Sequence, residues 1–392
     1  MRPAIYAHLH VMDSSEVSHD LSYWNAFYPP PNWLRRTQFD AVILHTTFLC
    51  MRWAPAFYVW KWQLRWVASL DCLKLAMPQD EYDHSEVLDE WLYEWGVSVV
   101  FSNFDPSYHV GLYPLMHRKA SFYKAFTGYI DEQAMSRWEG KQPALKERPV
   151  DIVYRASRLP YWFGNHGQMK SQIADRVAER ASERGMKCDI STRPEDTIVG
   201  DRWEKFLASG RAIIGCESGS SVLDRRGEIK ALIQVKLQSN PTLSYEQISQ
   251  SLPKGWDSYK FFAIGPRHFE AVVTKTCQVL IEGHYDGVFE ADRHYIPLKR
   301  DYSNLEEVLD KLEDIQLVSK VVDQAYADIC LSDKYSYRAF AAMIDRVLSE
   351  TTPRRAAWHF RSSRFFGDAG RVLEKVNNGR LAVRGRLKEL IR

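Results

Sequence analysis

The segment from residue 266 to residue 301 constrains the fold more than any other part of the chain. It reads PRHFEAVVTKTCQVLIEGHYDGVFEADRHYIPLKRD. Its pattern predicts four consecutive elements: a helix over 267–274, a strand over 277–281, a glycine-bearing loop over 283–287 and a second strand over 294–298. The unbroken apolar run Val279-Leu280-Ile281 is typical of a parallel strand that is covered on both faces. Open α/β sheets bind ligands in the loops that follow such strands, so we expect a site here.

The same alternation of apolar runs and helical periodicity continues along the chain. We expect further strands at 4–10, 39–45, 74–77, 97–101, 150–154, 187–190 and 212–216. We expect further helices at 51–70, 85–95, 169–184, 202–209, 245–252, 305–312, 317–330 and 335–350. Strands that alternate with helices at this spacing predict an α/β fold with parallel, doubly wound sheets.

The length of the chain predicts two domains. Its 392 residues exceed the size of about 250–300 residues at which single cores stop growing. The polar stretch 138–147 predicts the linker. We therefore assign residues 1–147 to an N-terminal Rossmann-like domain and residues 148–350 to a second one, which carries a polar insertion at 217–257. Residues 351–392 are expected to form a basic, aromatic, helical tail.

Signatures of several other enzyme classes are missing from the sequence. Residues 217–221, Glu-Ser-Gly-Ser-Ser, resemble a phosphate-cradling loop, but no Gly-Lys-Ser/Thr ending follows. No strand exit carries Gly-x-Gly-x-x-Gly, and Ser218 does not lie in a Gly-x-Ser-x-Gly elbow. ATP hydrolysis, dinucleotide oxidoreduction and serine hydrolase chemistry are therefore poorly supported.

The cysteines and the hydropathy predict a cytoplasmic protein. Six scattered cysteines without a Cys-x-x-Cys pair are typical of free thiols in a reducing compartment. The N-terminus has no charged start followed by an uninterrupted apolar core, as a signal peptide would. No apolar stretch reaches the length of about 18 residues that spans a bilayer.

The segment 266–304 resembles the C-terminal domain of group 1 glycosyltransferases. In that family a Glu-Ala-x-Ala-x-Gly helix precedes a Pro-Val-Val strand and a Gly-Gly-x-x-Glu loop. Here Phe269-Glu270-Ala271 begins the corresponding run, followed by Gln278-Val279-Leu280 and Gly283-His284-Tyr285-Asp286-Gly287. The resemblance implies the GT-B arrangement, in which two Rossmann-like domains face a cleft and the first domain binds the acceptor. It also implies that Glu270, which matches the family's glutamate, binds the ribose of a sugar nucleotide.

Two departures from the family pattern indicate a distant relative. The family's Glu-x7-Glu signature has an acid eight positions upstream of the glutamate matched by Glu270, where this chain has Phe262. The Gly-Gly pair is replaced by Tyr285-Asp286-Gly287.

Basic residues at strand exits are candidates for the diphosphate of the donor, because cations there stabilise the charge that builds on the leaving group. Arg155 and Arg267 are the first candidates, and the alternative is that they are solvated arginines. For Glu270 the alternative is a favourable position near a helix N-terminus. The predicted donor-binding set is Arg155, Arg158, Arg267, Glu270, His284, Tyr285, Asp286, Gly287 and Lys299.

A base for the acceptor hydroxyl is expected from the first domain, at strand ends. The candidates are His45, Asp80 and Glu81. As an alternative, Asp80 and Asp83 cap a helix near Ser85, and a strand-end histidine is a core residue. The acidic run resembles a Mg²⁺ ligand set, but the fold that the chain resembles does not usually need a metal. We therefore expect neither metal nor cofactor, and a nucleotide-sugar as co-substrate.

Two surfaces suggest partners. Trp62 and Trp66 are expected together on the outer side of a helix, with Lys61 and Arg65 near them. Residues 353–392 carry eleven Lys/Arg and three Asp/Glu, a net charge of +8, interleaved with aromatic residues. Both surfaces suit an anionic membrane and a lipid-linked acceptor at its cytoplasmic face. Alternatively, the tail packs back onto the first domain. No nucleic-acid partner is expected.

The resemblance therefore implies a glycosyltransferase that moves a sugar from a nucleotide-sugar donor to a glycan or lipid-linked acceptor, in the synthesis of surface polysaccharide or glycoconjugate. It favours retention of the anomeric configuration. Two alternatives stay open. One is a non-catalytic nucleotide- or carbohydrate-binding relative that acts as a scaffold, which Phe262 supports. The other is a sugar-nucleotide epimerase, which needs paired carboxylates across the cleft.

Overall fold

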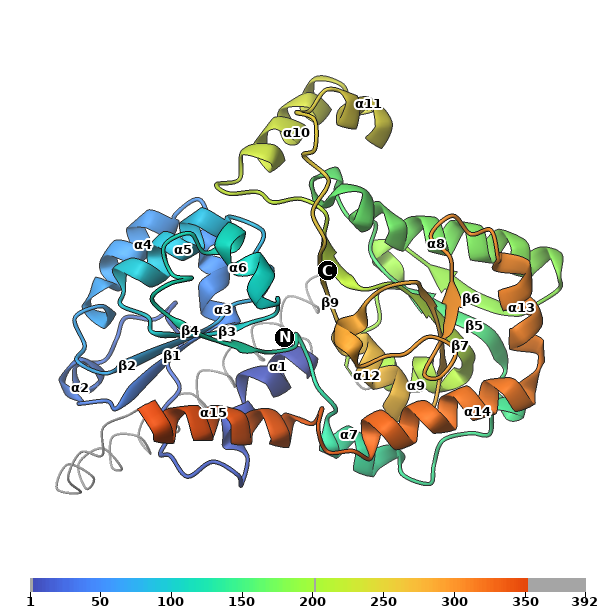
Figure 1. Cartoon of the computed structure of the whole chain (residues 1–392), viewed down its shortest axis with the longest axis horizontal. Coiled ribbons are helices and arrows are strands. Elements are labelled where there is room, and N and C mark those ends of the chain that lie inside the picture. Colours follow the sequence, from blue (N-terminus) through green and yellow to red (C-terminus); the bar gives the residue numbers. More distant parts are fainter. Residues whose placement is uncertain (1–2, 201, 352–392) are drawn as a thin grey trace, which may run out of the picture.

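Two parallel β-sheets, each covered by helices, lie side by side in the computed structural model of the chain (Figure 1). The structure describes residues 3–200 and 202–351. The strand order is β1-β2-β3-β4 in the first sheet and β11-β10-β7-β5-β6 in the second, and every pairing within these two sheets is parallel. The predicted α/β fold with two parallel, helix-covered sheets is confirmed, and the strand order of the second sheet reverses as in a doubly wound fold.

The first domain forms around four short strands, of which β1, β2 and β3 carry buried apolar residues. Three of them were predicted, and β4 was not, because its sequence SFYK has an exposed end and no apolar run. The strands are β1 Ala41–His45, β2 Leu73–Met77, β3 Val99–Ser102 and β4 Ser121–Lys124. The helices are α1 Pro3–Leu9, α2 Asn32–Arg36, α3 Thr46–Leu49, α4 Phe57–Gln63, α5 Ser85–Glu94, α6 Pro106–Leu112 and α7 Glu132–Trp138.

Two predictions for the first domain were wrong. The expected strand at 4–10 is helix α1, whose His8 is buried with its ring 5.4 Å from that of Phe340. Tertiary packing decides whether this segment is a helix or a strand, because its apolar residues fit the period of both. The expected helix at 51–70 is also much shorter: α4 ends at Gln63, and a separate 3-10 turn covers Arg65–Val67.

The second domain follows its prediction closely. Its strands are β5 Val150–Arg155, β6 Cys188–Ser191, β7 Gly210–Gly215, β10 Cys277–Ile281 and β11 Ile296–Leu298. Its main helices are α8 Gly164–Glu183, α9 Arg202–Ser209, α12 Pro266–Val273, α13 Leu305–Glu313 and α14 Ile315–Ala325. All five residues of β10 are buried, as expected for a strand between two parallel neighbours.

An excursion leaves the second sheet after β7. Its base is a two-stranded antiparallel ribbon of β8 Ser218–Ser220 and β9 Phe261–Ala263. Between them lie α10 Glu228–Ser239, which was not predicted, and α11 Tyr245–Gln250, which was; both stand above the two domains in Figure 1. Gly219 has φ +115°, and a Cβ there would lie 1.9 Å from the carbonyl oxygen of Phe261, so the ribbon requires glycine.

Helix α15, Tyr337–Thr351, returns to the first domain. It was expected to close the second domain, but its buried side chains pack on one face of the first sheet, together with Leu75 and Phe101. An amphipathic helix buries its apolar stripe on whichever sheet face lies uncovered, and the sequence does not say which. The predicted tail, apart from Thr351, lies outside the described residues. No helix among the described residues is long and apolar enough to cross a membrane.

Candidate functional site

The carboxyl ends of strands from both sheets meet where the two domains touch. Lys124, the last residue of β4, reaches across the junction: its Nζ lies 2.6 Å from Oδ1 of Asp286, which follows β10. The same Nζ lies 3.1 Å from Oδ1 of Asp105, which follows β3. Ligands of open parallel sheets bind at such edges, so the candidate site is placed here.

A buried carboxylate, Glu217, occupies the centre of this edge. It follows β7 and is 4% exposed, and its Oε1 accepts a hydrogen bond from the backbone N–H of Tyr285 at 2.8 Å. Burial raises the pKa of Glu217, and the neighbouring carboxylate of Asp286 adds to the shift. A Cβ at Gly283 would lie 2.4 Å from Oε2 of Glu217, so glycine lets the loop pass over the acid.

Two hydrogen-bond acceptors near Glu217 have no partner in the protein. One is Oδ2 of Asp286, a residue that adopts a left-handed backbone with φ 51°. The other is Nδ1 of His166, which is buried. Nε2 of His166 donates to the carbonyl oxygen of Glu217 at 2.9 Å, and the ring stacks on Phe262 with centroids 3.7 Å apart. Burial lowers the pKa of His166 to about 3, so Nδ1 carries a lone pair at neutral pH. Unsatisfied buried acceptors are costly unless a ligand supplies donors.

Three cations from different elements surround the end of β7. They are Lys170 on α8, Arg267 on α12 and Arg300 after β11, and each acts to lower the pKa of the Cys216 thiol, although burial raises that pKa overall. Arg300 also lowers the pKa of Glu217, and its guanidinium lies 5.5 Å from the Phe262 ring. Such a concentration of positive charge suits a phosphate or diphosphate.

Arg267 and Glu270, two of the predicted donor-binding residues, both lie on α12. Nη2 of Arg267 donates to the carbonyl oxygen of Arg155 at 2.6 Å, and its guanidinium lies between the rings of Tyr154 and Trp203. Glu270 accepts a hydrogen bond from Nε1 of Trp203 at 2.7 Å. Burial raises the pKa of Glu270. A ribose hydroxyl would have to share this carboxylate with the indole.

The other predicted arginines already have acidic partners. Nη2 of Arg155 lies 2.6 Å from Oδ1 of Asp189, and its other donors reach backbone carbonyls. Arg158 is exposed and lies 2.8 Å from Oδ1 of Asp175. An open pocket adjoins them, lined by residues that include Arg155, Asp175, Ser191, Thr192, Arg193 and Asp196.

The predicted glycine loop divides into structural and exposed residues. Tyr285 is fully buried, and its hydroxyl donates to the carbonyl oxygen of Ile281 at 2.7 Å, so it holds the loop in place. His284 is exposed and acts electrostatically on Glu217. Gly287 has φ +70°, which favours glycine. Lys299 is exposed at the end of β11.

Of the three predicted acceptor bases, Asp80 alone is exposed. His45 lies in the first domain with Nε2 2.8 Å from Nδ1 of the buried His8, and burial lowers the pKa of His45 to about 3. Glu81 is completely buried and accepts hydrogen bonds from Ser102, Tyr113 and the backbone of Asn103. These contacts fit core roles, whereas a base must reach its substrate.

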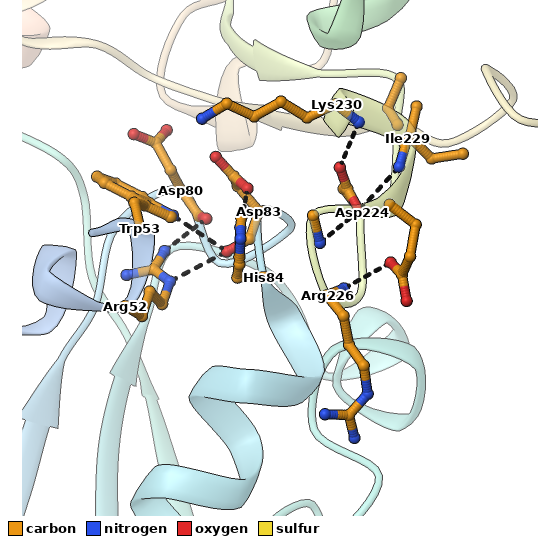
Figure 2. A network of polar contacts seen from close by, with 12 residues as sticks. Arg52, Trp53, Asp80, Asp83, His84, Asp224, Arg226, Ile229 and Lys230 are labelled. Carbon is orange, nitrogen blue, oxygen red and sulfur yellow. Dashed lines mark hydrogen bonds and ion pairs between the residues drawn. The ribbon is translucent and has the colours of Figure 1, made fainter. Parts of the chain in front are cut away.

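Asp80 lies on a turn that faces the excursion (Figure 2). Its Oδ1 accepts a hydrogen bond from the Tyr82 hydroxyl at 2.7 Å, and the Tyr82 ring stacks on Phe261 of β9. Arg52 holds the turn through the carbonyl oxygens of Gln79 and Asp80. The alternative of helix capping was wrong, because the residue before α5 is His84, with φ 55°, and no side chain caps the helix.

Three residues of this site had no recognised signal in the sequence: Lys124, His166 and Lys170. Lys124 ends β4, and recognition of that strand would have marked it as a strand-end residue. His166 precedes the region where helical periodicity becomes visible. The resemblance of residues 217–221 to a phosphate loop was misleading, because Ser218–Ser220 form strand β8. Within residues 3–200 and 202–351, no three His, Cys, Asp or Glu side chains are placed to hold a metal ion.

Comparison of the sequence with protein-family models and with curated proteins finds no match. Similar solved structures include TarM, with 7% identity over 74% of this chain and 53% of its own, at a TM-score of 0.43. The chain thus spans about half the length of TarM. HepE of Anabaena in complex with UDP-glucose is 12% identical over 79% of either chain, with a TM-score of 0.38. Trehalose 6-phosphate synthase of Burkholderia multivorans is 12% identical over 90% of this chain and 85% of its own, with a TM-score of 0.39. These overlaps are loose, so function is inferred from the site.

Proposed function

We propose that the protein is a glycosyltransferase that transfers a sugar from a nucleotide-sugar donor bound at the domain junction. One observation carries this proposal: two unsatisfied acceptors, Nδ1 of His166 and Oδ2 of Asp286, lie beside the buried Glu217. Sugar hydroxyls are donors that would satisfy them. The three cations at the end of β7 supply the complementary site for a diphosphate.

The arrangement favours departure of a nucleoside diphosphate. Negative charge grows on the leaving diphosphate in the transition state, and preorganised cations at that position lower the barrier. Lys170, Arg267 and Arg300 have this role in the proposal, and Glu270 binds the ribose. The nucleotide is a co-substrate, and neither a metal nor a further cofactor takes part.

The acceptor approaches from the first domain, where Asp80 is exposed on the turn that faces the excursion. We propose a glycan or lipid-linked acceptor in the synthesis of surface polysaccharide or glycoconjugate in the cytoplasm. Retention of the anomeric configuration follows from the resemblance of the 266–304 segment to retaining enzymes.

A thermal-shift screen tests donor binding. The purified protein is mixed with UDP-, GDP-, dTDP-, CDP- and ADP-linked sugars, and we expect stabilisation by donors of one base. Ligand at about 100 times its dissociation constant adds about 2.7 kcal/mol to the stability of the native state. Arg300→Ala and Glu270→Ala are expected to weaken donor binding by about tenfold or more, because each variant removes a charged side chain that binds the donor in this proposal. Arg293→Ala, an exposed arginine paired with Asp328, is the matched control. A lack of stabilisation by every donor refutes the proposal.

Turnover separates the enzyme from a binding protein. With the donor that binds, we expect release of nucleoside diphosphate by the wild type, and at least about 100-fold slower release by Asp286→Asn with binding retained, as for loss of a positioned polar group. The packing of Phe262 on His166, where the family has an acid, favours a non-catalytic nucleotide-binding relative as the second candidate. Binding without any turnover would decide for that candidate. Release of an altered nucleotide-sugar without an acceptor would instead identify an epimerase.

A further inference from the structure

The first domain presents an exposed aromatic surface on α4 and on the segment before α2. Phe27 is 70% exposed, Tyr58 66%, Val59 56% and Trp62 62%. Phe27 joins the surface through its contact with Trp60, whose ring centroid lies 5.6 Å away. Arg35 joins it through Trp66, with its guanidinium 5.9 Å from that ring. We call the set Phe27, Arg35, Tyr58, Val59, Trp62 and Arg65 the aromatic face, and the exposed Arg36 follows Arg35 at the end of α2.

The aromatic face is the outer side of a helix whose inner side is already packed. Phe57 is buried in the core of the first domain, as is Leu64 at the end of α4. Tyr58 and Trp62, four residues apart, lie on the opposite side. Trp66, expected to lie with Trp62, is half-buried and its ring packs on Trp24 instead. Monomeric proteins rarely expose large apolar side chains in one place without a binding role.

Positive charge accompanies the aromatic side chains. Residues 21–70 contain five Lys/Arg and a single acid, Asp40. Arg65 lies with its guanidinium 4.7 Å from the Trp62 ring, and Arg35 and Arg36 are exposed. Lys61, by contrast, is paired with Glu94 at 2.6 Å. Arg35, Arg36 and Arg65 therefore have no acidic partner within residues 21–70. Such a group of positive charges is complementary to a negatively charged surface.

We propose that the aromatic face binds the surface of an anionic lipid bilayer. Tryptophan and tyrosine favour the headgroup region, where the ring is buried and the polar atom stays wet. Phe27 and Val59 carry no polar side-chain atoms and enter the acyl boundary. The arginines pair with lipid phosphates, and each basic residue near an anionic leaflet strengthens the attraction. The protein thus lies on the membrane and does not cross it.

This inference is independent of the proposed function, because the aromatic face contains no residue of the junction site. It also differs from the prediction for residues 353–392, which lie outside the described part of the chain. A chain that ends at Thr351 keeps the aromatic face but lacks residues 353–392, so it separates the contributions of the two basic surfaces to binding.

Flotation of the full chain with lipid vesicles tests the inference. Vesicles are made of phosphatidylcholine alone or with phosphatidylglycerol. We expect binding to the anionic vesicles, weakened by salt. The variant Tyr58→Ser/Trp62→Ser and the variant Arg35→Glu/Arg36→Glu are each expected to lower the bound fraction by about tenfold or more. Val110→Ser is the matched control, since Val110 is 65% exposed on α6 of the same domain. Because every substituted side chain is exposed, all variants should keep the wild-type melting temperature.

The chain that ends at Thr351 is expected to keep binding that depends on Trp62. The inference is overturned if the wild type does not bind anionic vesicles, or if the Tyr58→Ser/Trp62→Ser variant binds them as the wild type does. It is equally overturned if binding is lost only when the tail is removed. A wild-type dimer that the same variant converts to a monomer, without vesicle binding, would assign the face to a second copy of the chain.

Discussion

Hydrogen-bond satisfaction distinguishes the buried Glu81 from Asp286 and His166 of the candidate site. Glu81 is completely buried, yet three donors reach its two carboxylate oxygens. Asp286 and His166 each leave one buried acceptor without a partner. A protein that only needs to fold gains nothing from such acceptors, because each unsatisfied one costs free energy. The two acceptors of the junction are therefore the observation on which the proposed donor site rests, while the contacts of Glu81 fit a folding role.

The titration of Glu81 makes stability depend on pH. Burial raises its pKa from 4.5 to about 7, against the opposing effect of its hydrogen bonds. Between these two values the native state holds a proton that the unfolded state releases, so this group makes the free energy of unfolding fall as pH rises. Glu81→Gln removes the titration. We expect the variant to gain stability relative to the wild type between about pH 4.5 and 7, on the order of 3 kcal/mol.

Denaturant unfolding of both proteins at several pH values measures this difference. A constant difference between wild type and Glu81→Gln from pH 4.5 to 7 would show that Glu81 is ionised in the native state throughout.

At the scale of elements, the excursion depends on one side chain that caps a helix. Asp224 accepts hydrogen bonds from the backbone N–H groups of Gly227 at 2.8 Å and Lys230 at 2.9 Å, at the start of α10 (Figure 2). Its own backbone N–H donates to the carbonyl oxygen of Tyr82 at 2.9 Å, in the first domain. The residue therefore starts α10 and ties it to the other domain at the same point.

Asp224→Ala is expected to loosen α10. Loss of a capping carboxylate costs about 1–2 kcal/mol, and the helix has a single fully buried side chain, Ile233, to hold it otherwise. We expect trypsin to cut after Lys230 and Lys236 several-fold faster than in the wild type. Ser244→Ala, which removes the cap of α11, is the control and should leave cleavage within α10 unchanged. Equal cleavage of Asp224→Ala and wild type would refute the capping role.

At the scale of the whole molecule, several contacts join the domains into one body. Lys124 bridges to Asp286, and Arg226 of the excursion pairs with Glu86 and Glu90 of α5. Helix α15 follows the second domain in sequence but covers the first sheet (Figure 1). The first domain is therefore completed by residues from the C-terminal half of the chain.

A chain that ends at Ser336 is expected to lose the fold of its first domain. It lacks the buried side chains of α15, which are Tyr337, Phe340, Ala341, Ile344, Val347 and Leu348. Burial of each large apolar side chain contributes about 1.5–3 kcal/mol to the free energy of unfolding. The sum over these side chains is comparable to the whole stability of a domain, about 5–15 kcal/mol. Near-ultraviolet circular dichroism and calorimetry measure the loss. The chain that ends at Thr351 is the matched control, and the difference between the two truncated chains measures the contribution of residues 337–351. A native-like first domain in the shorter chain would contradict this role of α15.

The sequence by itself determined the strands of the second sheet and the helices α9 and α12. Strands β5, β7 and β10 carry continuous apolar runs, and α9 and α12 have clear periods and boundaries, so local pattern and final structure agree. The glycine loop after β10 was likewise readable, because left-handed turns and close approaches select glycine at positions such as Gly283 and Gly287.

Tertiary structure alone decided α1, the placement of α15 and the composition of the site. Residues 4–10 satisfy a strand or a helix equally well, and only packing on α15 selects the helix. The site joins Lys124, His166, Glu217 and Asp286, which are far apart in the sequence. Each of them has an ordinary local context, and their significance comes from burial and from missing partners. Burial and hydrogen-bond satisfaction depend on which chain segments meet in space, and no local pattern encodes that.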